Sequence, residues 1–195
     1  MYSISNIIVQ VSINNFGVDT MAAWTAYSKI DFIFWMINSA FGISVMTFVG
    51  QNYGAGKWDR IRRGTKICLG MALISAVSVS IILMSAERFL FGIFVNDAGV
   101  VEIGIHMMNV IAPAYLLFAF IEVFSGALRA QGAVVVSTLI TMVGICVLRM
   151  IWVTLVAAHG TLEQVIICYP ITWAAGALAM SIYYIYKQRK IFQAR

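Results

Sequence analysis

Glu122 is the residue of this sequence with the clearest potential for chemistry, because it is a carboxylic acid inside a long apolar stretch. A charged side chain in a membrane span costs roughly 2.5–3.5 kcal/mol on insertion scales, and it therefore faces a cavity or a partner. Tyr115, Ser125 and Arg129 recur with Glu122 at helical spacing, which predicts one shared stripe. Two interpretations stay open. Glu122 is either a proton- or cation-responsive group that lines a cavity or a structural carboxylate bonded to a neighbouring Ser, Asn or Arg.

Asn38 and Trp173 are the other polar or aromatic candidates within apolar stretches. Asn38 shares a stripe with Asp31 and Trp35, so we expect it to face other helices. Trp173 shares a second stripe with Tyr169 and further aromatic and Met residues. Such side chains suit an adaptable pocket for flat hydrophobic cations, although helix packing and lipid-facing aromatic belts use the same residue types. We expect Asn38, Trp173 and Tyr115 to face a cavity.

Charges near the ends of apolar stretches have a simpler interpretation. Arg149 lies in the outer part of its stretch, and we expect it to extend toward the outer interface or to form a structural ion pair rather than to contact a substrate. Lys29 and Asp31 stand at the start of another stretch, where interfacial charge is ordinary. These three residues are therefore not predicted to form a binding site.

The sequence offers little for enzymatic chemistry. Cys68, Cys146 and Cys168 are far apart in apolar stretches, which indicates small buried residues rather than metal ligands. His106 and His159 are isolated, and no phosphate-binding loop, dinucleotide motif or nucleophile elbow occurs. We therefore expect no enzyme activity and no bound cofactor.

The elements that must position these residues are membrane helices. The 195 residues are 62% hydrophobic and only 11% charged, with a mean hydropathy of +0.91, and a water-soluble domain needs more polar surface. Apolar runs of about 20 residues cross a bilayer as helices, because each helix satisfies its own backbone groups. The predicted fold is all-α and polytopic, with six membrane-spanning helices. The expected spans are residues 1–18, 30–49, 67–84, 103–128, 133–157 and 165–186.

Basic residues alternate along the connections, which predicts the orientation of the chain. Ten of the thirteen Lys and Arg residues lie in every second connection: Lys57, Arg60, Arg62, Arg63, Lys66, Arg129, Lys187, Arg189, Lys190 and Arg195. Cytoplasmic connections hold such an excess, so the C-terminus is predicted to be cytoplasmic, in a plasma membrane. The net charge of +5 is explained by this topology, and no nucleic-acid partner is expected.

The first apolar stretch is short for a full crossing and has no basic flank of the kind that precedes a signal peptide. We therefore expect a truncated first helix, and a chain that is a fragment of a longer protein.

Three segments together carry a resemblance to a known family. They are residues 13–23 (INNFGVDTMAA), 48–60 (FVGQNYGAGKWDR) and 125–132 (SGALRAQG). Their order and spacing resemble the C-terminal half of MATE transporters, the multidrug and toxic compound extrusion family of the MOP flippase superfamily. The resemblance covers essentially the whole chain.

The resemblance implies a complete protein of twelve helices in two six-helix lobes around a central cavity. Such proteins export cationic amphiphiles against a proton or sodium gradient. The implied partners are therefore the lipid bilayer, a missing N-terminal lobe and organic cation or amphiphilic drug substrates. Glu122 and Arg129 fall on the implied tenth helix, and Glu122 is expected to tune coupling.

Two departures from the family pattern stand out, of which the first bears on the coupling ion, proton or sodium, and the second on how the stretch 133–157 begins. Phe118 stands where sodium-coupled relatives carry a carboxylate, so their sodium site does not transfer to this chain. Residues 132–134 read Gly-Ala-Val in place of the usual Gly-Asp-Thr.

Two other functions stay open at this point. A lipid-linked saccharide flippase of the same superfamily has a similar hydropathy profile, and a strongly basic cavity would favour it because its cargo is anionic. A non-transporting membrane remnant or scaffold is the second alternative. A single lobe is not expected to transport, because alternating access needs one bundle to move against another.

Overall fold

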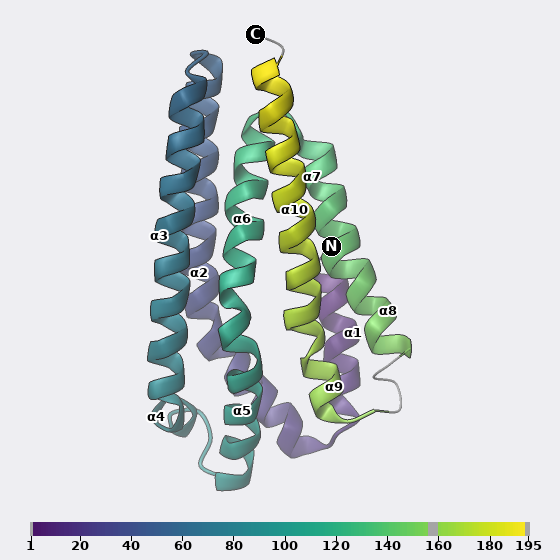
Figure 1. Cartoon of the computed structure of the whole chain (residues 1–195). Coiled ribbons are helices and arrows are strands. Elements are labelled where there is room, and N and C mark those ends of the chain that lie inside the picture. Colours follow the sequence, from purple (N-terminus) through teal and green to yellow (C-terminus); the bar gives the residue numbers. More distant parts are fainter. Residues whose placement is uncertain (1, 156–159, 194–195) are drawn as a thin grey trace.

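The computed structural model describes residues 2–155 and 160–193, and within these ranges it is helical and has no strand. Figure 1 shows an elongated bundle of helices that run side by side. The all-α class is confirmed. The elements are α1 (Tyr2–Asn14), α2 (Val18–Gly54), α3 (Trp58–Ser85), α4 (Glu87–Gly92), α5 (Ala98–Ile111), η1 (Ala112–Ala114), α6 (Tyr115–Ala130), α7 (Val134–Thr141), η2 (Met142–Val147), α8 (Leu148–Leu155), α9 (Leu162–Ile166) and α10 (Cys168–Gln193).

Five helical segments of the described chain are long and apolar enough to cross a bilayer. They are Val18–Gly54, Trp58–Ser85, Ala98–Ala130, Val134–Leu155 and Leu162–Ile191. Helix α1 has 13 described residues, fewer than the roughly 20 that a crossing needs. On α3, Ile67, Ile74 and Ile81 recur on one face and are exposed. An apolar outer face of this kind suits contact with lipid chains.

Helix α2 is much longer than the apolar stretch within it. It contains 37 residues and begins at Val18, directly after Gly17, whose φ of 98° breaks the preceding helix. Asp19 lies in its first turn, where an acidic side chain interacts favourably with the helix dipole. Because α2 begins this early, Asp31 lies more than three turns inside the helix and not at its N-terminal end.

The segment from Ala98 to Ala130 continues through Pro113 with a short change of helix type. Proline has no backbone N–H to donate, and the chain tightens there into the 3₁₀ turn η1. The hydroxyl of Ser80 donates a hydrogen bond of 2.7 Å to the carbonyl oxygen of Ala112. Helix α3 thereby holds the junction of α5 and α6 in place.

Helix α6 is the centre of the bundle, and it packs against α2, α3 and α10 (Figure 1). A Cβ atom added to Gly126 on α6 would lie 2.7 Å from the carbonyl oxygen of Gly42 on α2. Small residues allow membrane helices to approach in this way. A second close approach occurs between η2 and α10, where a Cβ added to Gly144 would lie 3.3 Å from the Cα of Gly176.

Three of the basic connections meet at one end of the bundle. The α2–α3 turn, the α6–α7 turn and the C-terminal part of α10 lie together at the top of Figure 1. The Nζ of Lys187 donates to the carbonyl oxygen of Gln131 at 2.8 Å, and the side-chain amide of Gln188 donates to Oε1 of Gln131 at 3.0 Å. These bonds tie α10 to the α6–α7 turn.

Candidate binding cavity

A cavity of about 560 Å³ lies between α1, α2, α6, α8 and α10, and we refer to it as the main cavity. This volume is within the range of sites for drug-sized ligands. Seven aromatic side chains contribute to its wall: Trp24, Tyr27, Phe32, Trp35, Phe118, Tyr169 and Trp173. Polar and charged side chains complete the lining, and Asp31, Glu122 and Arg149 carry its charges.

Asp31 is held in the main cavity by hydrogen bonds from aromatic side chains. Its Oδ2 accepts a bond of 2.6 Å from Nε1 of Trp35, one turn further along α2. Its Oδ1 accepts a bond from the hydroxyl of Tyr115 on α6. The Tyr115 hydroxyl lies 3.2 Å from that of Tyr27, and the Tyr115 ring stacks on Phe34 with centroids 3.9 Å apart. The carboxylate therefore has a defined position and two satisfied oxygens.

The aromatic rings around Asp31 form a connected wall. Trp35 meets Phe118 edge to face at 4.6 Å, and Phe118 meets Trp173 at 5.4 Å. Tyr169 meets Trp173 at 5.6 Å. Aromatic faces attract cations through their quadrupole, and a carboxylate adds a full opposite charge. This combination can bind an organic cation that also has a flat apolar body.

Arg149 is buried in the same region, with 3% of its surface exposed. Its Nη1 donates to Oδ1 of Asn6 at 3.0 Å, and its guanidinium lies 4.1 Å from the ring centroid of Tyr169. The expectation that Arg149 extends to the outer interface is therefore wrong. Helices α1 and α10 both pack against α8 and cover the face that carries this side chain.

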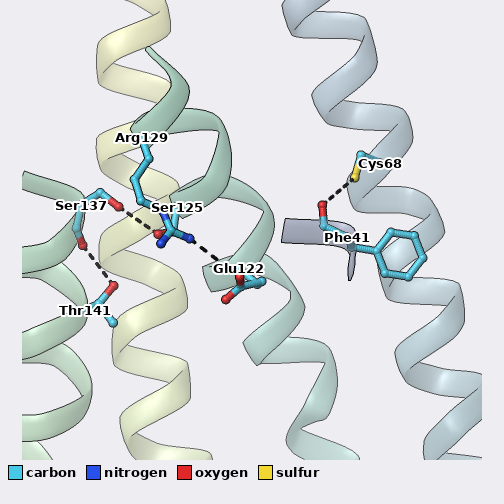
Figure 2. A network of polar contacts seen from close by, with 7 residues as sticks. All are labelled: Phe41, Cys68, Glu122, Ser125, Arg129, Ser137 and Thr141. Carbon is cyan, nitrogen blue, oxygen red and sulfur yellow. Dashed lines mark hydrogen bonds and ion pairs between the residues drawn. The ribbon is translucent and has the colours of Figure 1, made fainter. Parts of the chain in front are cut away.

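Glu122 lies between the main cavity and a second pocket of about 290 Å³ between α6 and the α7–η2 segment. Its Oε1 is 3.7 Å from Nη2 of Arg129, as Figure 2 shows. The hydroxyls of Ser125 and Ser137 are 2.9 Å apart beside this pair. A Cβ atom at Gly42 would overlap the Glu122 carboxylate, so this side chain packs directly on the backbone of α2. Glu122 thus has both a cavity face and a structural partner.

The five residues predicted from the sequence have different positions. Glu122 and Trp173 line the main cavity, and Tyr115 reaches it through its bond to Asp31. Arg129 lines the second pocket with Glu122. Asn38 is buried within the bundle and is not among the residues of the main-cavity wall. What each residue does in transport stays a prediction.

The sequence interpretation missed Asp31, which the structure places at the centre of the polar network. Two signals were present. Trp35 follows Asp31 by one helical turn and can donate to it, and Asn38 extends the same stripe. The missing information was the start of the helix. With α2 beginning at Val18, Asp31 lies more than three turns inside a helix that is a candidate membrane span, and ionisable groups within such helices mark functional sites.

These features define a class of protein: a polytopic helical membrane protein with a charged aromatic cavity between its helices. The family model described as MatE matches residues 1–155. The chain therefore belongs to the MATE family of transporters and is a multi-pass membrane protein, and its relatives are transporters rather than enzymes.

Two curated relatives illustrate the similarity. "Probable multidrug resistance protein YoeA" of Bacillus subtilis is 24% identical across 98% of this chain and 42% of its own length. "Multidrug and toxin extrusion protein 1" of Homo sapiens is 22% identical across 78% of this chain and 28% of its own length. The chain thus spans less than half the length of these relatives.

Solved structures show the same fold. An outward-facing multidrug resistance MATE family transporter of the MOP superfamily superimposes with a TM-score of 0.89, at 15% identity, across 98% of this chain and 44% of its own length. The bent form of the Vibrio cholerae MATE transporter VcmN gives a TM-score of 0.86, at 16% identity, across 96% of this chain and 43% of its own length. The helical arrangement is therefore that of MATE transporter lobes.

Proposed function

We propose that this chain is one lobe of a secondary active antiporter that exports organic cations or cationic amphiphilic drugs in exchange for protons or sodium ions. The observation that carries the proposal is Asp31, a carboxylate oriented by Trp35 and Tyr115 inside an aromatic cavity. The names of the multidrug resistance and extrusion relatives support the same function.

Competition at Asp31 would couple the two fluxes. The Asp31 carboxylate neutralises one monovalent cation at a time, so a drug and a coupling ion exclude one another at this residue. Alternating access then moves the drug one way and the ion the other, as this lobe and its partner lobe rock around the site. Glu122 lines the same cavity and would respond to the state of Asp31 through charge.

The lining charges also distinguish this proposal from the flippase alternative. The main cavity contains two carboxylates, Asp31 and Glu122, against the single guanidinium of Arg149. Arg149 is moreover engaged by Asn6 and Tyr169. A cavity wall with more negative than positive side chains suits a cationic cargo better than the anionic cargo of a lipid-linked saccharide flippase.

The orientation and the membrane belong to the same proposal. The basic end of the bundle would lie in the cytoplasm and the protein in the plasma membrane, because cytoplasmic connections accumulate Lys and Arg. A topology reporter fused after Arg195 tests this point. Activity of the reporter only on the outer side would contradict it.

The transport test uses the complete transporter that contains this lobe, reconstituted in proteoliposomes with an imposed pH or sodium gradient. Asp31→Asn removes the charge and keeps the shape, and we expect ethidium transport to fall by about tenfold to a hundredfold, the worth of bonds to a charged group. Asp19→Asn is the matched control on the same helix, because Asp19 is exposed in its first turn. Equal transport by the two variants would overturn the proposal.

A further inference from the structure

A separate pocket of about 280 Å³ opens between α3 and α10, at the end of the bundle where the basic connections meet. Six residues line it: Arg62, Lys66, Tyr184, Ile185, Gln188 and Arg189. We propose that this end pocket binds an anionic phospholipid, with the headgroup phosphate on its basic rim and an acyl chain along α10.

The rim of the end pocket is strongly basic on both of its helices. Arg62 and Lys66 are one turn apart on α3 and therefore share a face, and Arg189 stands opposite them on α10. Segments 55–66 and 184–193 contain further Lys and Arg residues and a single acidic one, Asp59. Basic pockets between membrane helices bind phosphate-bearing lipid headgroups, because the charges converge where the headgroups lie.

An apolar track leads from this rim into the membrane-spanning part of α10. Leu178, Ile182 and Ile185 are exposed and recur at spacings of four and three residues, so they share one face. Arg189 is the next position of that stripe, and the stripe belongs to the span Leu162–Ile191. A basic site at one end of an apolar stripe matches the phosphate and the acyl chain of a phospholipid. Free inorganic phosphate has no apolar part that could contact the stripe.

The wall of the pocket offers a further hydrogen-bond donor. The Tyr184 hydroxyl is buried, lies beside Thr65, and has no hydrogen-bond partner of normal geometry among the residues that the structure describes. The Tyr184 ring stacks on Phe124 with centroids 4.5 Å apart. Buried donors are normally satisfied, and a phosphate oxygen in the pocket would satisfy this one.

The test measures lipid binding to the complete transporter that contains this lobe, purified in detergent. Native mass spectrometry gives the apparent affinity for phosphatidylglycerol, with phosphatidylcholine and inorganic phosphate as comparison probes. The pocket variant combines Arg62→Gln with Lys66→Gln. The matched control combines Arg60→Gln with Arg63→Gln, which removes two charges from the same end of α3 but from outside the pocket lining.

We expect the pocket variant to bind phosphatidylglycerol about thirtyfold more weakly, the worth of two basic side chains at a membrane surface, and the control to stay within about threefold. Equal losses in both variants would show diffuse surface attraction and overturn the proposal. Equal affinity for phosphatidylcholine, or full displacement of the lipid by millimolar phosphate, would overturn it too. If the pocket variant does not purify as a folded protein, Arg189→Gln on α10 decides by the same criteria.

Discussion

Asp31 and Glu122 are two carboxylates in the wall of one cavity, and their surroundings differ. Asp31 accepts hydrogen bonds from the aromatic side chains of Trp35 and Tyr115, on two different helices. Glu122 has a long ion pair of 3.7 Å with Arg129 on its own helix, and it packs on the α2 backbone at Gly42.

The comparison shows that two carboxylates of one cavity can differ in how freely their charge can attract a cation. Bonds from other side chains orient the Asp31 charge toward the cavity without neutralising it, so it remains available to a bound cation. The Glu122 charge is already offset in part by a cation of the protein. We therefore expect Asp31 to dominate binding and Glu122 to adjust it.

The largest effect separates the two carboxylates directly. In the complete transporter, Asp31→Asn should weaken binding of tetraphenylphosphonium, a lipophilic cation, by about tenfold or more, because it removes the charge that attracts it. Glu122→Gln should change the same affinity by less than about threefold, because Arg129 shares its charge. Isothermal titration calorimetry of the detergent-solubilised protein measures both. Similar losses of affinity in both variants would show that Asp31 and Glu122 contribute equally to cation binding, and would contradict the comparison.

A smaller effect is expected at Tyr115, which orients Asp31. Tyr115→Phe deletes one hydrogen bond to the carboxylate and keeps the ring stacked on Phe34, so affinity for tetraphenylphosphonium should fall by about threefold to tenfold. Tyr183→Phe serves as the control, since Tyr183 is not among the residues that line the main cavity. An unchanged affinity in Tyr115→Phe would mean that Asp31 needs no orientation.

We expect Glu122 to affect the pH dependence of transport more than the affinity for the cation. Glu122→Gln removes a titratable group from the cavity wall, and we expect the pH profile of ethidium efflux by the complete transporter to shift. Glu102→Gln is the control, because Glu102 is exposed and paired with Arg88 at 2.7 Å outside the cavity. A wild-type profile in Glu122→Gln would rule out a coupling role for this residue.

The smallest effect is expected at Arg129. Its ion pair with Glu122 is long and partly exposed, and such pairs contribute about 0–1 kcal/mol to stability. Arg129→Gln should therefore leave the unfolding temperature of the purified transporter nearly unchanged, as Arg88→Gln should at the exposed pair with Glu102. A large loss in Arg129→Gln alone would show that Glu122 depends on this partner, and the contrast with Asp31 would weaken.

The sequence predicted the helical class well and the site only in part. Long apolar stretches are local features, and they indicated membrane helices directly. The motif segments around Gly50 and Gly126 indicated the family. Glu122 and Trp173 were found because polar and aromatic residues at helical spacing share a face.

The errors came from two things that the sequence does not state: where a helix begins, and which other helices pack against it. Polar residues before residue 30 hid the true start of α2, so Asp31 was placed at the beginning of a helix, whereas it lies more than three turns inside one. Arg149 was expected to reach water because it lies near the end of its own stretch, yet Asn6 and Tyr169 from two other helices enclose it.

Composition and periodicity by themselves determined that this chain is a helical membrane protein with a basic end, because burial in lipid and charge at its surface act on each residue locally. Only the tertiary structure decided which charges share a cavity. Tyr27 and Tyr115 are 88 positions apart, and Asn6 and Arg149 are 143 positions apart, and each pair is in contact. Such contacts depend on how α1, α2, α6, α8 and α10 pack together, and the spacing of residues along one helix contains no information about its neighbours.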